Sequence, residues 1–312
     1  MNILVRADSS SNIGTGHIMR DLVLAQQYAK KGHKIIFATQ DLQGNINHKI
    51  EEAKYQLEIL NSNDIKELNT KIKELKINMI VIDHYGIDYK FEKELKSKNP
   101  KLKILSIDDT YEKHYCDILL NHNISAYNKK YIKLTPKNCE LRCGAKFTLL
   151  REEFLQEMNK IKKRKFKKDN SFITIFIAMG GADHSNINID ILKVIKKIKN
   201  HSKIKVNLVT TIANKNLEKL KNYCKNKPWI KLHINSNKIA KLMIKSDFAI
   251  VTPSVTVNEV YFMKLPFIAI KTANNQAMIY KYLKKKKFNV LKKFNSQNLL
   301  KFLKNILKKS ND

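Results

Sequence analysis

Short apolar runs alternate with amphipathic stretches along the whole chain. Runs rich in Ile, Leu, Val and Phe predict buried strands. They fall at 1–5, 34–39, 56–60, 78–83, 103–107 and 116–120, and again at 172–178, 204–210, 230–234, 248–251 and 266–271. Between them, apolar residues recur at helical spacing at 18–31, 46–55, 64–76, 189–198, 214–224 and 239–244. Strands that alternate with helices in this way predict an α/β protein built on parallel sheets.

The two halves of the chain open alike, with a strand, a glycine-bearing turn and a helix. In the second half these are 172–178, Met179-Gly180-Gly181 and 189–198. The repetition predicts two similar Rossmann-like domains that face each other across a cleft. Between Lys160 and Lys168, seven of nine residues are basic, so we expect 155–170 to be an exposed connector. This places the domains at 1–164 and 165–312.

The C-terminal stretch 281–312 carries regularly spaced apolar residues among its lysines. We expect a closing amphipathic helix packed on the second sheet, and a basic helix lying on a membrane is the less favoured alternative. The apolar positions are Leu299, Leu300, Leu303, Ile306 and Leu307.

Length and composition indicate a globular protein. The 312 residues are enough for two domains of ordinary size, and 43% of them are hydrophobic. No run of eighteen apolar residues occurs, and the N-terminus lacks the basic and then apolar build of a secretion signal. We therefore expect a cytoplasmic protein with no membrane span.

The formal net charge of +32 raises the alternative of a nucleic-acid-binding module. Most of the cations are lysines scattered between apolar positions, whereas arginine is the residue favoured for bidentate phosphate and base recognition. A solvated lysine-rich surface without a specific nucleic acid partner explains the charge better. The arginines are Arg6, Arg20, Arg142, Arg151 and Arg164.

The four cysteines show neither a C-x-x-C pair nor a zinc spacing with the histidines. In a cytosolic chain this pattern favours reduced thiols. We expect no metal and no cofactor, and the chain carries no D-x-D or H-E-x-x-H motif.

The stretch Arg6 to Asp21, RADSSSNIGTGHIMRD, joins the first strand to the first helix. Gly14 and Gly16 permit backbone angles closed to other residues and a close approach of a ligand, and the start of the helix near His17 offers unpaired amides to an anion. A third glycine of the dinucleotide fingerprint is missing, because Met19 stands there. A tight turn without a ligand is therefore the alternative.

Polar residues follow three of the predicted parallel strands. Asp8 precedes His17, Asp83 precedes His84 and Tyr85, and Asp108 precedes Asp109. Ligands of open α/β sheets bind outside the carboxyl ends of the strands, so we expect these residues on one rim. Helix capping or turn formation is the alternative for Asp83 and Asp108.

In the second half, the strand 248–251 runs into Thr252 to Glu259. Ser254 and Thr256 are good caps for a following helix, whose free amides are suited to a diphosphate. Glu259, one turn into that helix, is placed to accept hydrogen bonds from ribose hydroxyls. An ordinary helix carboxylate is the alternative.

The segment R-x-D-S-S-S-x-I-G-x-G-H-I-x-R-D-L-x-L-A resembles the start of the UDP-2,4-diacetamido-2,4,6-trideoxy-β-L-altropyranose hydrolases of pseudaminic acid synthesis, which are similar to GT-B glycosyltransferases. Further matches span most of the chain: VIDHYGI at 81–87, LSIDD at 105–109, CDILLN at 116–121, LRCG at 141–144, LREEF at 150–154, MGG at 179–181 and VNE at 257–259. The resemblance implies a GT-B-like fold whose second domain binds UDP. It departs from the family in the loop 252–256 and after Gly181.

Chemistry and resemblance together predict His17 as the catalytic general base. UDP leaves without protonation, so one base that activates water is sufficient, and attack at the anomeric carbon inverts that centre. Asp8 or a serine is the expected group that orients the ring. The predicted substrate-binding residues are Asp8, Gly14, Gly16, Arg20, Tyr85, Arg151, Gly180, Gly181, Ser254, Val257, Asn258, Glu259 and Asn275.

We expect a monomer whose partners are the UDP-sugar and water. A GT-B glycosyltransferase that delivers the sugar to an alcohol is the alternative enzyme, because the same base and UDP site serve both reactions.

Overall fold

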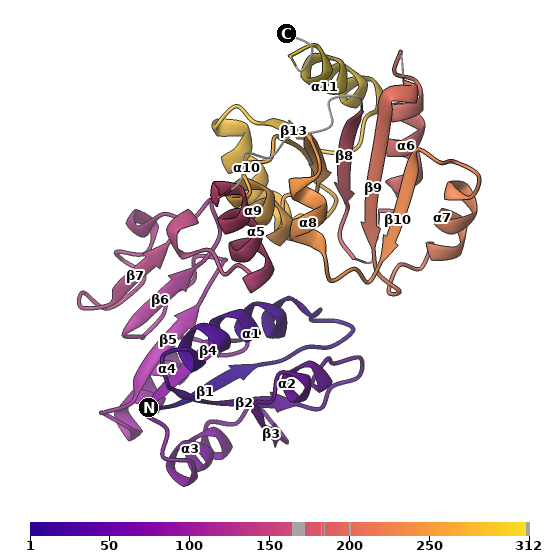
Figure 1. Ribbon diagram of the computed structural model, residues 1–312. Coiled ribbons are helices and arrows are strands. Elements are labelled where there is room, and N and C mark those ends of the chain that lie inside the picture. The colour runs from indigo at the N-terminus through magenta and orange to yellow at the C-terminus, as the bar shows by residue number, and fades with distance from the viewer. Residues whose placement is uncertain (164–171, 182, 184, 200, 310–312) are drawn as a thin grey trace. The chain divides into compact units, whose positions relative to one another are not determined.

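The structure is a computed structural model that describes residues 1–163, 172–181, 183, 185–199 and 201–309. The chain divides into two compact units, Met1–Leu150 and Arg151–Asp312 (Figure 1). Each unit contains one sheet of parallel strands, which confirms the predicted α/β class. In the described part of the chain, no helix has both the length and the apolar composition that a membrane span requires.

The first unit is built on a seven-stranded sheet in the order β3-β2-β1-β4-β5-β6-β7, with every pair of neighbours parallel. The order reverses direction at β1 and β4, which lie side by side with Ala7 paired to Asp83. The carboxyl ends of these two strands therefore meet at the middle of one sheet edge. The strands are β1 Asn2–Ala7, β2 Lys34–Gln40, β3 Gln56–Leu60, β4 Met79–Asp83, β5 Lys103–Ile107, β6 Ile118–Asn121 and β7 Glu140–Cys143.

Residues of β1 and β4 alternate between two core clusters on the two faces of this sheet. Odd-numbered residues such as Val5 and Val81 pack with apolar residues of α1. Even-numbered residues such as Leu4 and Ile82 pack with apolar residues of α3 and α4. Because side chains alternate along a strand, Asp83 at the end of β4 lies on the α1 face. The helices of this unit are α1 Gly16–Ala29, α2 His48–Glu52, α3 Ile65–Glu74 and α4 Tyr89–Lys98.

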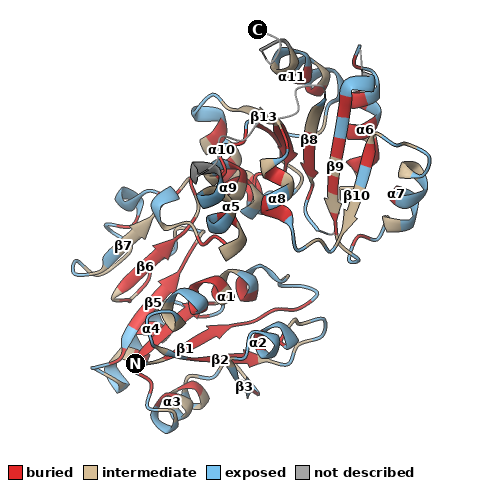
Figure 2. Ribbon diagram, viewed as in Figure 1, coloured by how far each residue is buried: buried red, intermediate tan, exposed pale blue. Residues whose placement is uncertain are grey.

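The second unit is built on a six-stranded parallel sheet in the order β10-β9-β8-β11-β12-β13. Buried residues follow its strands and the inner sides of its helices (Figure 2). The strands are β8 Ile173–Ala178, β9 Ile204–Thr210, β10 Ile230–Ile234, β11 Phe248–Val251, β12 Phe267–Ile270 and β13 Asn289–Leu291. The helices are α5 Glu152–Lys163, α6 Asn188–Lys196, α7 Leu217–Cys224, α8 Ile239–Ile244, α9 Val255–Phe262, α10 Ala277–Lys285 and α11 Ser296–Lys309.

The closing amphipathic helix is confirmed as α11. Leu299 and Leu303 are fully buried in the core of the second unit, together with Ile195 of α6. The predicted stretch 281–312 also contains the end of α10 and the short edge strand β13, which the sequence did not separate. Residues 310–312 lie outside the described part of the chain.

The predicted connector and domain boundary differ from the structure. Residues 152–163 form the helix α5, so 155–163 are not an irregular connector, although 155–160 are exposed or half-buried. Phe154, just before the predicted connector, is fully buried. The side chain of Glu153 accepts a hydrogen bond from the amide of Ala240 in α8 at 3.2 Å. This helix therefore belongs to the second unit, and the division falls after Leu150 and not between 164 and 165. Most of the basic part of the predicted connector, 164–170, lies outside the described residues.

Two further elements of the first unit were not predicted. In α4 only Glu92 and Leu95 are buried, so its sequence has almost no apolar stripe. Strand β7 is at the edge of the sheet and has no fully buried residue. Both elements depend on tertiary contacts that the local pattern does not carry.

Candidate active site

The turn after β1 leaves the start of α1 uncrowded. Gly14 has φ +86°, and its amide donates to the carbonyl of Ser10 at 2.8 Å. Helix α1 begins at Gly16, and Thr15 before it makes no side-chain capping bond. A Cβ added at Gly14 or at Gly16 would meet no heavy atom within 4 Å. The backbone therefore requires glycine at 14, whereas the fold itself leaves room for a side chain at 16.

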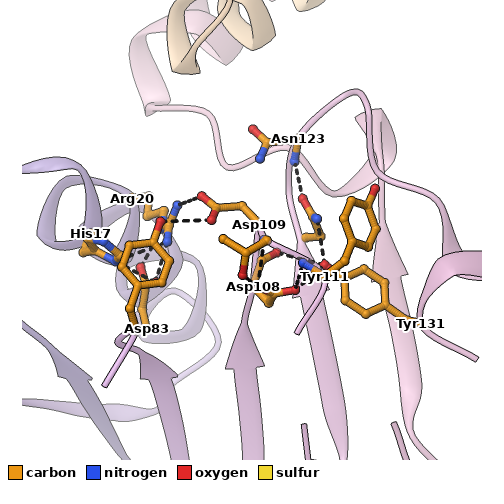
Figure 3. Close-up of polar contacts among 11 residues, drawn as sticks. His17, Arg20, Asp83, Asp108, Asp109, Tyr111, Asn123 and Tyr131 are labelled. Carbon is orange, nitrogen blue, oxygen red and sulfur yellow. Dashed lines mark hydrogen bonds and ion pairs between the residues drawn. The ribbon is translucent and has the colours of Figure 1, made fainter. Parts of the chain in front are cut away.

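His17 and Asp83 form a close pair at this edge of the sheet (Figure 3). The Nδ1 atom of His17 lies 2.8 Å from Oδ1 of Asp83, and the Asp83 side chain is 1% exposed. Burial alone would raise the pKa of Asp83, but the charge and hydrogen bonds of Arg20 and the contact with His17 hold it well below the usual range. An ionised carboxylate has no proton to donate, so Nδ1 carries the hydrogen of this bond. In the neutral ring Nε2 is then the free acceptor.

Arg20 connects this pair to a second carboxylate. Its Nε donates to Oδ2 of Asp83 at 2.6 Å, and its Nη1 donates to Oδ2 of Asp109 at 3.1 Å (Figure 3). Burial would lower the pKa of Arg20, but Asp83 and Asp109 raise it further above its normal value. The guanidinium is therefore a permanent positive charge beside His17, with its Nη2 3.2 Å from Nδ1.

Tyr85 packs edge-on against the ring of His17. The ring centroids are 4.9 Å apart at an interplanar angle of 85°, and the tyrosine hydroxyl donates to Oδ1 of Asp109 at 3.0 Å. Burial of the hydroxyl and the charge of Asp109 raise its pKa above the usual value. Tyr85 itself is 65% exposed, whereas the His17 side chain is 8% exposed. The tyrosine therefore shields the imidazole and still presents a face to solvent.

Asp8 does not orient His17, so that expectation was wrong. Its carboxylate accepts hydrogen bonds from Arg6 at 2.6 and 2.8 Å, from the amide of Gln40 at 2.8 Å and from Nε2 of His84 at 3.0 Å. Arg6 is an even-numbered residue of β1 and faces away from α1, and Asp8 continues that side. The charge and hydrogen bonds of Arg6 and His84 outweigh burial and lower the pKa of Asp8.

The serines of this loop do not orient His17 either. The hydroxyl of Ser9 accepts from the amide of Ile46 at 3.0 Å, and that of Ser10 accepts from the amide of Ile13 at 3.0 Å. They shape the loop, and Asp83 is the group that holds the ring.

Asp108 forms a turn, which was the alternative to a role in the site. It accepts hydrogen bonds from the amides of Thr110 and Tyr111, both at 2.8 Å, and from the hydroxyl of Tyr131 at 2.6 Å (Figure 3). Its neighbour Asp109 is the residue that reaches Arg20. The expected gathering of strand ends on one rim is therefore confirmed for Asp83 and Asp109.

In the second unit, Gly180 and Gly181 follow β8. Gly180 has φ +84°, and a Cβ at this position would meet nothing within 4 Å. A Cβ at Gly181 would lie 2.9 Å from the side chain of Thr211, whose hydroxyl donates to the carbonyl of Gly181 at 2.9 Å. The loop after β8 is thus held against the loop after β9, and glycine is required at 181 by packing.

Ser254 occupies the N-cap position of α9, as predicted, but its hydroxyl does not cap the helix. It lies 2.9 Å from the hydroxyl of Thr252. Thr256 is inside the helix, and Val257 and Asn258 are buried. The first amides of α9 therefore donate no hydrogen bond to the Ser254 side chain.

Glu259 is placed one turn into α9 and is bound by Arg151, whose Nη2 donates to Oε1 at 3.1 Å. Nη1 of Arg151 also pairs with Glu153 at 2.7 Å. Burial raises the pKa of Glu259, and Arg151 offsets only part of this increase. Asn275 lies apart from these residues in the chain, exposed in the 3₁₀ turn Asn274–Gln276.

Several residues of the first cluster were not predicted as site residues. Asp83 holds His17, Asp109 holds Arg20 and Tyr85, and Asp21 and His122 are buried beside them. One sequence signal was available, because residues 17, 20 and 21 share one face of a helix. That Asp83 ends the strand paired with β1 is shown only by the structure.

Comparison with known proteins gives a relative along nearly the whole chain. The chain is 40% identical over 294 residues to the UDP-2,4-diacetamido-2,4,6-trideoxy-beta-L-altropyranose hydrolase of Campylobacter jejuni, covering 94% of this chain and 100% of that protein. It is 28% identical over 292 residues to an uncharacterized protein of Methanocaldococcus jannaschii, covering 91% of this chain and 59% of the relative. No protein-family model matches the chain.

Among solved structures, glycosyltransferase-like folds match at low sequence identity. The spinosyn rhamnosyltransferase SpnG aligns with a TM-score of 0.68 at 8% identity, over 99% of this chain and 92% of that one. MurG of Acinetobacter baumannii aligns with a TM-score of 0.63 at 11% identity, over 98% and 90%. These matches concern the fold alone, which resembles that of the GT-B glycosyltransferases. The identity to the Campylobacter enzyme over its full length decides the family: this chain belongs to the UDP-2,4-diacetamido-2,4,6-trideoxy-beta-L-altropyranose hydrolases.

Proposed function

We propose that this protein hydrolyses UDP-2,4-diacetamido-2,4,6-trideoxy-β-L-altropyranose to UDP and the free sugar, a step of pseudaminic acid synthesis. Water forms a bond to the anomeric carbon, and the bond from that carbon to the diphosphate oxygen breaks. The electron pair leaves with UDP, and the proton of the water passes to the enzyme. The observation that carries the proposal is the His17–Asp83 pair in a chain of this family.

The pair is suited to a general base. Asp83 accepts the hydrogen of Nδ1, which leaves the lone pair of Nε2 to take a proton from water. When the ring becomes an imidazolium, the neighbouring carboxylate stabilises the new charge. Arg20 keeps Asp83 ionised throughout, because it binds both carboxylate oxygens.

A single displacement by water inverts the anomeric centre, and this is the stereochemistry we propose. UDP is a weak base and needs no protonation when it leaves. The charge of the diphosphate requires donors, and the first amides of α9 and the glycine turn at 180–181 are suited to supply them. Glu259 is proposed to hold the ribose hydroxyls. The remaining predicted contacts, among them Asn258 and Asn275, stay part of this proposal.

Turnover in oxygen-18 water tests the bond that breaks. Carbon attack places the label in the sugar, and we expect all of it there. Label in UDP means attack at phosphorus and contradicts the mechanism. Proton NMR of the first-formed anomer, recorded before mutarotation, tests inversion in the same sample.

Substitution of the base tests the role of His17. His17→Leu should lower kcat at least about 100-fold, since a general base contributes roughly 10² to 10⁴ in rate. His48→Leu is the matched control, because His48 is exposed at the start of α2. A folded His17→Leu protein with the kcat of the control contradicts the proposal.

A second candidate function is transfer of the sugar to an alcohol, which the GT-B neighbours favour. Incubation of the purified protein with the UDP-sugar alone separates the two. A hydrolase releases UDP and free sugar in equal amounts without an acceptor. A transferase releases little of either until an alcohol is added.

A further inference from the structure

Helix α1 directs a third polar side chain at Asp83. Asp21 follows His17 by four residues, so the two share one face of the helix, and it lies within hydrogen-bonding reach of the Asp83 carboxylate. Asp21 is fully buried, at 0% exposure. The proposed reaction assigns no role to this residue.

The surroundings of Asp21 do not support a second negative charge. Within the described part of the chain, no hydrogen-bond donor reaches either of its oxygens. A buried ionised carboxylate without donors is strongly unfavourable, and a neutral carboxyl group is the usual outcome. Burial and the adjacent charge of Asp83 raise the pKa of Asp21 well above its usual range.

The titratable and charged groups around Asp21 and its neighbours Asp83 and Arg20 come from four elements. Helix α1 contributes His17 and Arg20, the end of β4 contributes Asp83, the turn after β5 contributes Asp109, and the residue after β6 is His122. Arg20 is the single cation among them when both histidines are neutral, and it already pairs with two carboxylates. Burial lowers the pKa of His122 to about 4, so this ring adds no positive charge at neutral pH. An ionised Asp21 would therefore leave the cluster with two uncompensated negative charges.

A neutral Asp21 removes one of the two uncompensated charges and turns one of its two unpartnered oxygens into a donor. Its carboxyl hydrogen points to the one partner that is an acceptor only, the ionised Asp83. Such a bond between a neutral acid and a carboxylate is charge-assisted and directional. Asp83 then receives hydrogens from His17, Arg20 and Asp21, which together hold its two oxygens in place.

We propose that Asp21 is a neutral carboxylic acid that donates its hydrogen to Asp83, and that this bond positions Asp83 to hold the catalytic histidine. The inference rests on the proposed function, because it assigns a positioning role for the same reaction. It does not place Asp21 in contact with substrate. It predicts that α1 supplies the base, a cation and a neutral acid to one carboxylate.

The protonation state is tested directly in the parent protein. With aspartate labelled by carbon-13 at the side-chain carboxyl, one resonance should keep the chemical shift of a protonated carboxyl at pH 7.5, and Asp21→Asn should remove it. If every aspartate carboxyl of the folded parent protein has the shift of an ionised group at pH 7.5, the inference is overturned. This measurement does not depend on activity, so it fails independently of the proposed function.

The pH dependence of kcat tests the positioning role. Asp21→Leu removes the donor, so Asp83 becomes the stronger partner of a protonated His17. We expect kcat to fall about tenfold and the acid limb of the profile to move to higher pH. Asp21→Asn keeps a neutral donor and should show the smaller change in both. If Asp21 is ionised, both variants remove a negative charge and move the acid limb to lower pH, which overturns the proposal. Should either variant fail to fold, the carboxyl shifts of the parent still decide the question.

Discussion

Replacing Asp83 by Asn is the sharpest test of the arrangement in the first unit. Oδ1 of Asp83 accepts from His17 and from Arg20, and Oδ2 accepts from Nε of Arg20. An amide keeps one acceptor and places an NH₂ donor at the other position. If the NH₂ faces His17, Nδ1 of the ring must accept a hydrogen bond and carry no hydrogen. The ring hydrogen then moves to Nε2, which is the atom proposed to take the proton from water. If the NH₂ faces Arg20, two donors oppose each other.

The first orientation removes the correct tautomer. The second keeps it but sets the amide against Arg20, and both remove the negative charge that stabilises an imidazolium. Loss of the carboxylate that orients a catalytic histidine costs up to about 10⁴ in kcat. We expect a decrease of about 10² to 10⁴, which corresponds to roughly 3 to 5 kcal/mol of activation free energy. The KM for the sugar nucleotide should change much less, because the Asp83 side chain is only 1% exposed.

The same change lowers stability. Removing one partner of a buried ion pair costs about 3 to 5 kcal/mol. Here Arg20 keeps Asp109 at 3.1 Å, and Asn keeps part of the hydrogen bonding, so we expect about 2 to 3 kcal/mol of unfolding free energy to be lost. A variant that is folded at the assay temperature, by circular dichroism and urea titration, separates the two effects.

Release of UDP is followed in a continuous coupled assay, with Asp117→Asn as the matched control. Asp117 also pairs with a cation, Lys96 at 2.9 Å, but it precedes β6 at the opposite edge of the sheet. The control should keep the kcat of the parent enzyme. A folded Asp83→Asn protein whose kcat lies within threefold of the control refutes the assignment of Asp83 as the partner of His17.

Three further predictions concern other parts of the structure. The unfolded chain protonates His122 near pH 6.5 and the folded protein only near pH 4, so the free energy of unfolding should fall by up to about 3 kcal/mol as the pH drops between these values. His122→Phe should lack that decrease in urea titrations at pH 6.5 and 4.5, and a variant with the pH slope of the parent contradicts the prediction. Gly16→Ala should change the unfolding free energy by no more than about 0.5 kcal/mol but raise the KM, whereas Gly14→Ala, strained at φ +86°, should lose about 1 to 2 kcal/mol of unfolding free energy. An unchanged KM for Gly16→Ala means that no ligand approaches this turn. Glu259→Gln should weaken UDP binding about tenfold in calorimetry, and Glu153→Gln should not; equal affinities contradict the ribose role.

The elements that the sequence predicted correctly are those with a strong local pattern. Buried strands such as 78–83 and 248–251 read as continuous apolar runs. Helix α3 was predicted at 64–76, and Asp64 caps it, with its Oδ1 accepting from the amide of Lys66 at 2.7 Å. Helix α5 was missed because the basic run that begins at Lys160 overlaps its end, and its contact with α8 shows that it belongs to the second unit. Propensity and charge describe the exposed face of such a helix, whereas packing determines its place.

The candidate site was predicted less completely than the fold. His17, Arg20 and Tyr85 were expected, and the structure brings them together. The role of Asp83 was not expected, since a single acidic residue after a strand is as consistent with a turn as with a catalytic pair. The choice between them depends on which face of the sheet α1 covers, and that is a property of the assembled unit.

Because side chains alternate along β1 and β4, two polar networks whose residues are neighbours in the sequence lie on opposite faces of the sheet. Asp83 faces α1 and holds His17, while the next residue, His84, faces the other side and binds Asp8. The amide of Gly86 donates to Nδ1 of His84 at 2.9 Å, so Nε2 carries the hydrogen that Asp8 accepts. A Cβ at Gly86 would lie 2.8 Å from Cε1 of His84, so the turn closes only with glycine. The turn after β4 is thereby fixed to both faces of the sheet, and this fixes the position of Tyr85 between them. A rigid turn of this kind holds the tyrosine against the imidazole in the absence of substrate, which is the preorganisation that the proposed general base requires.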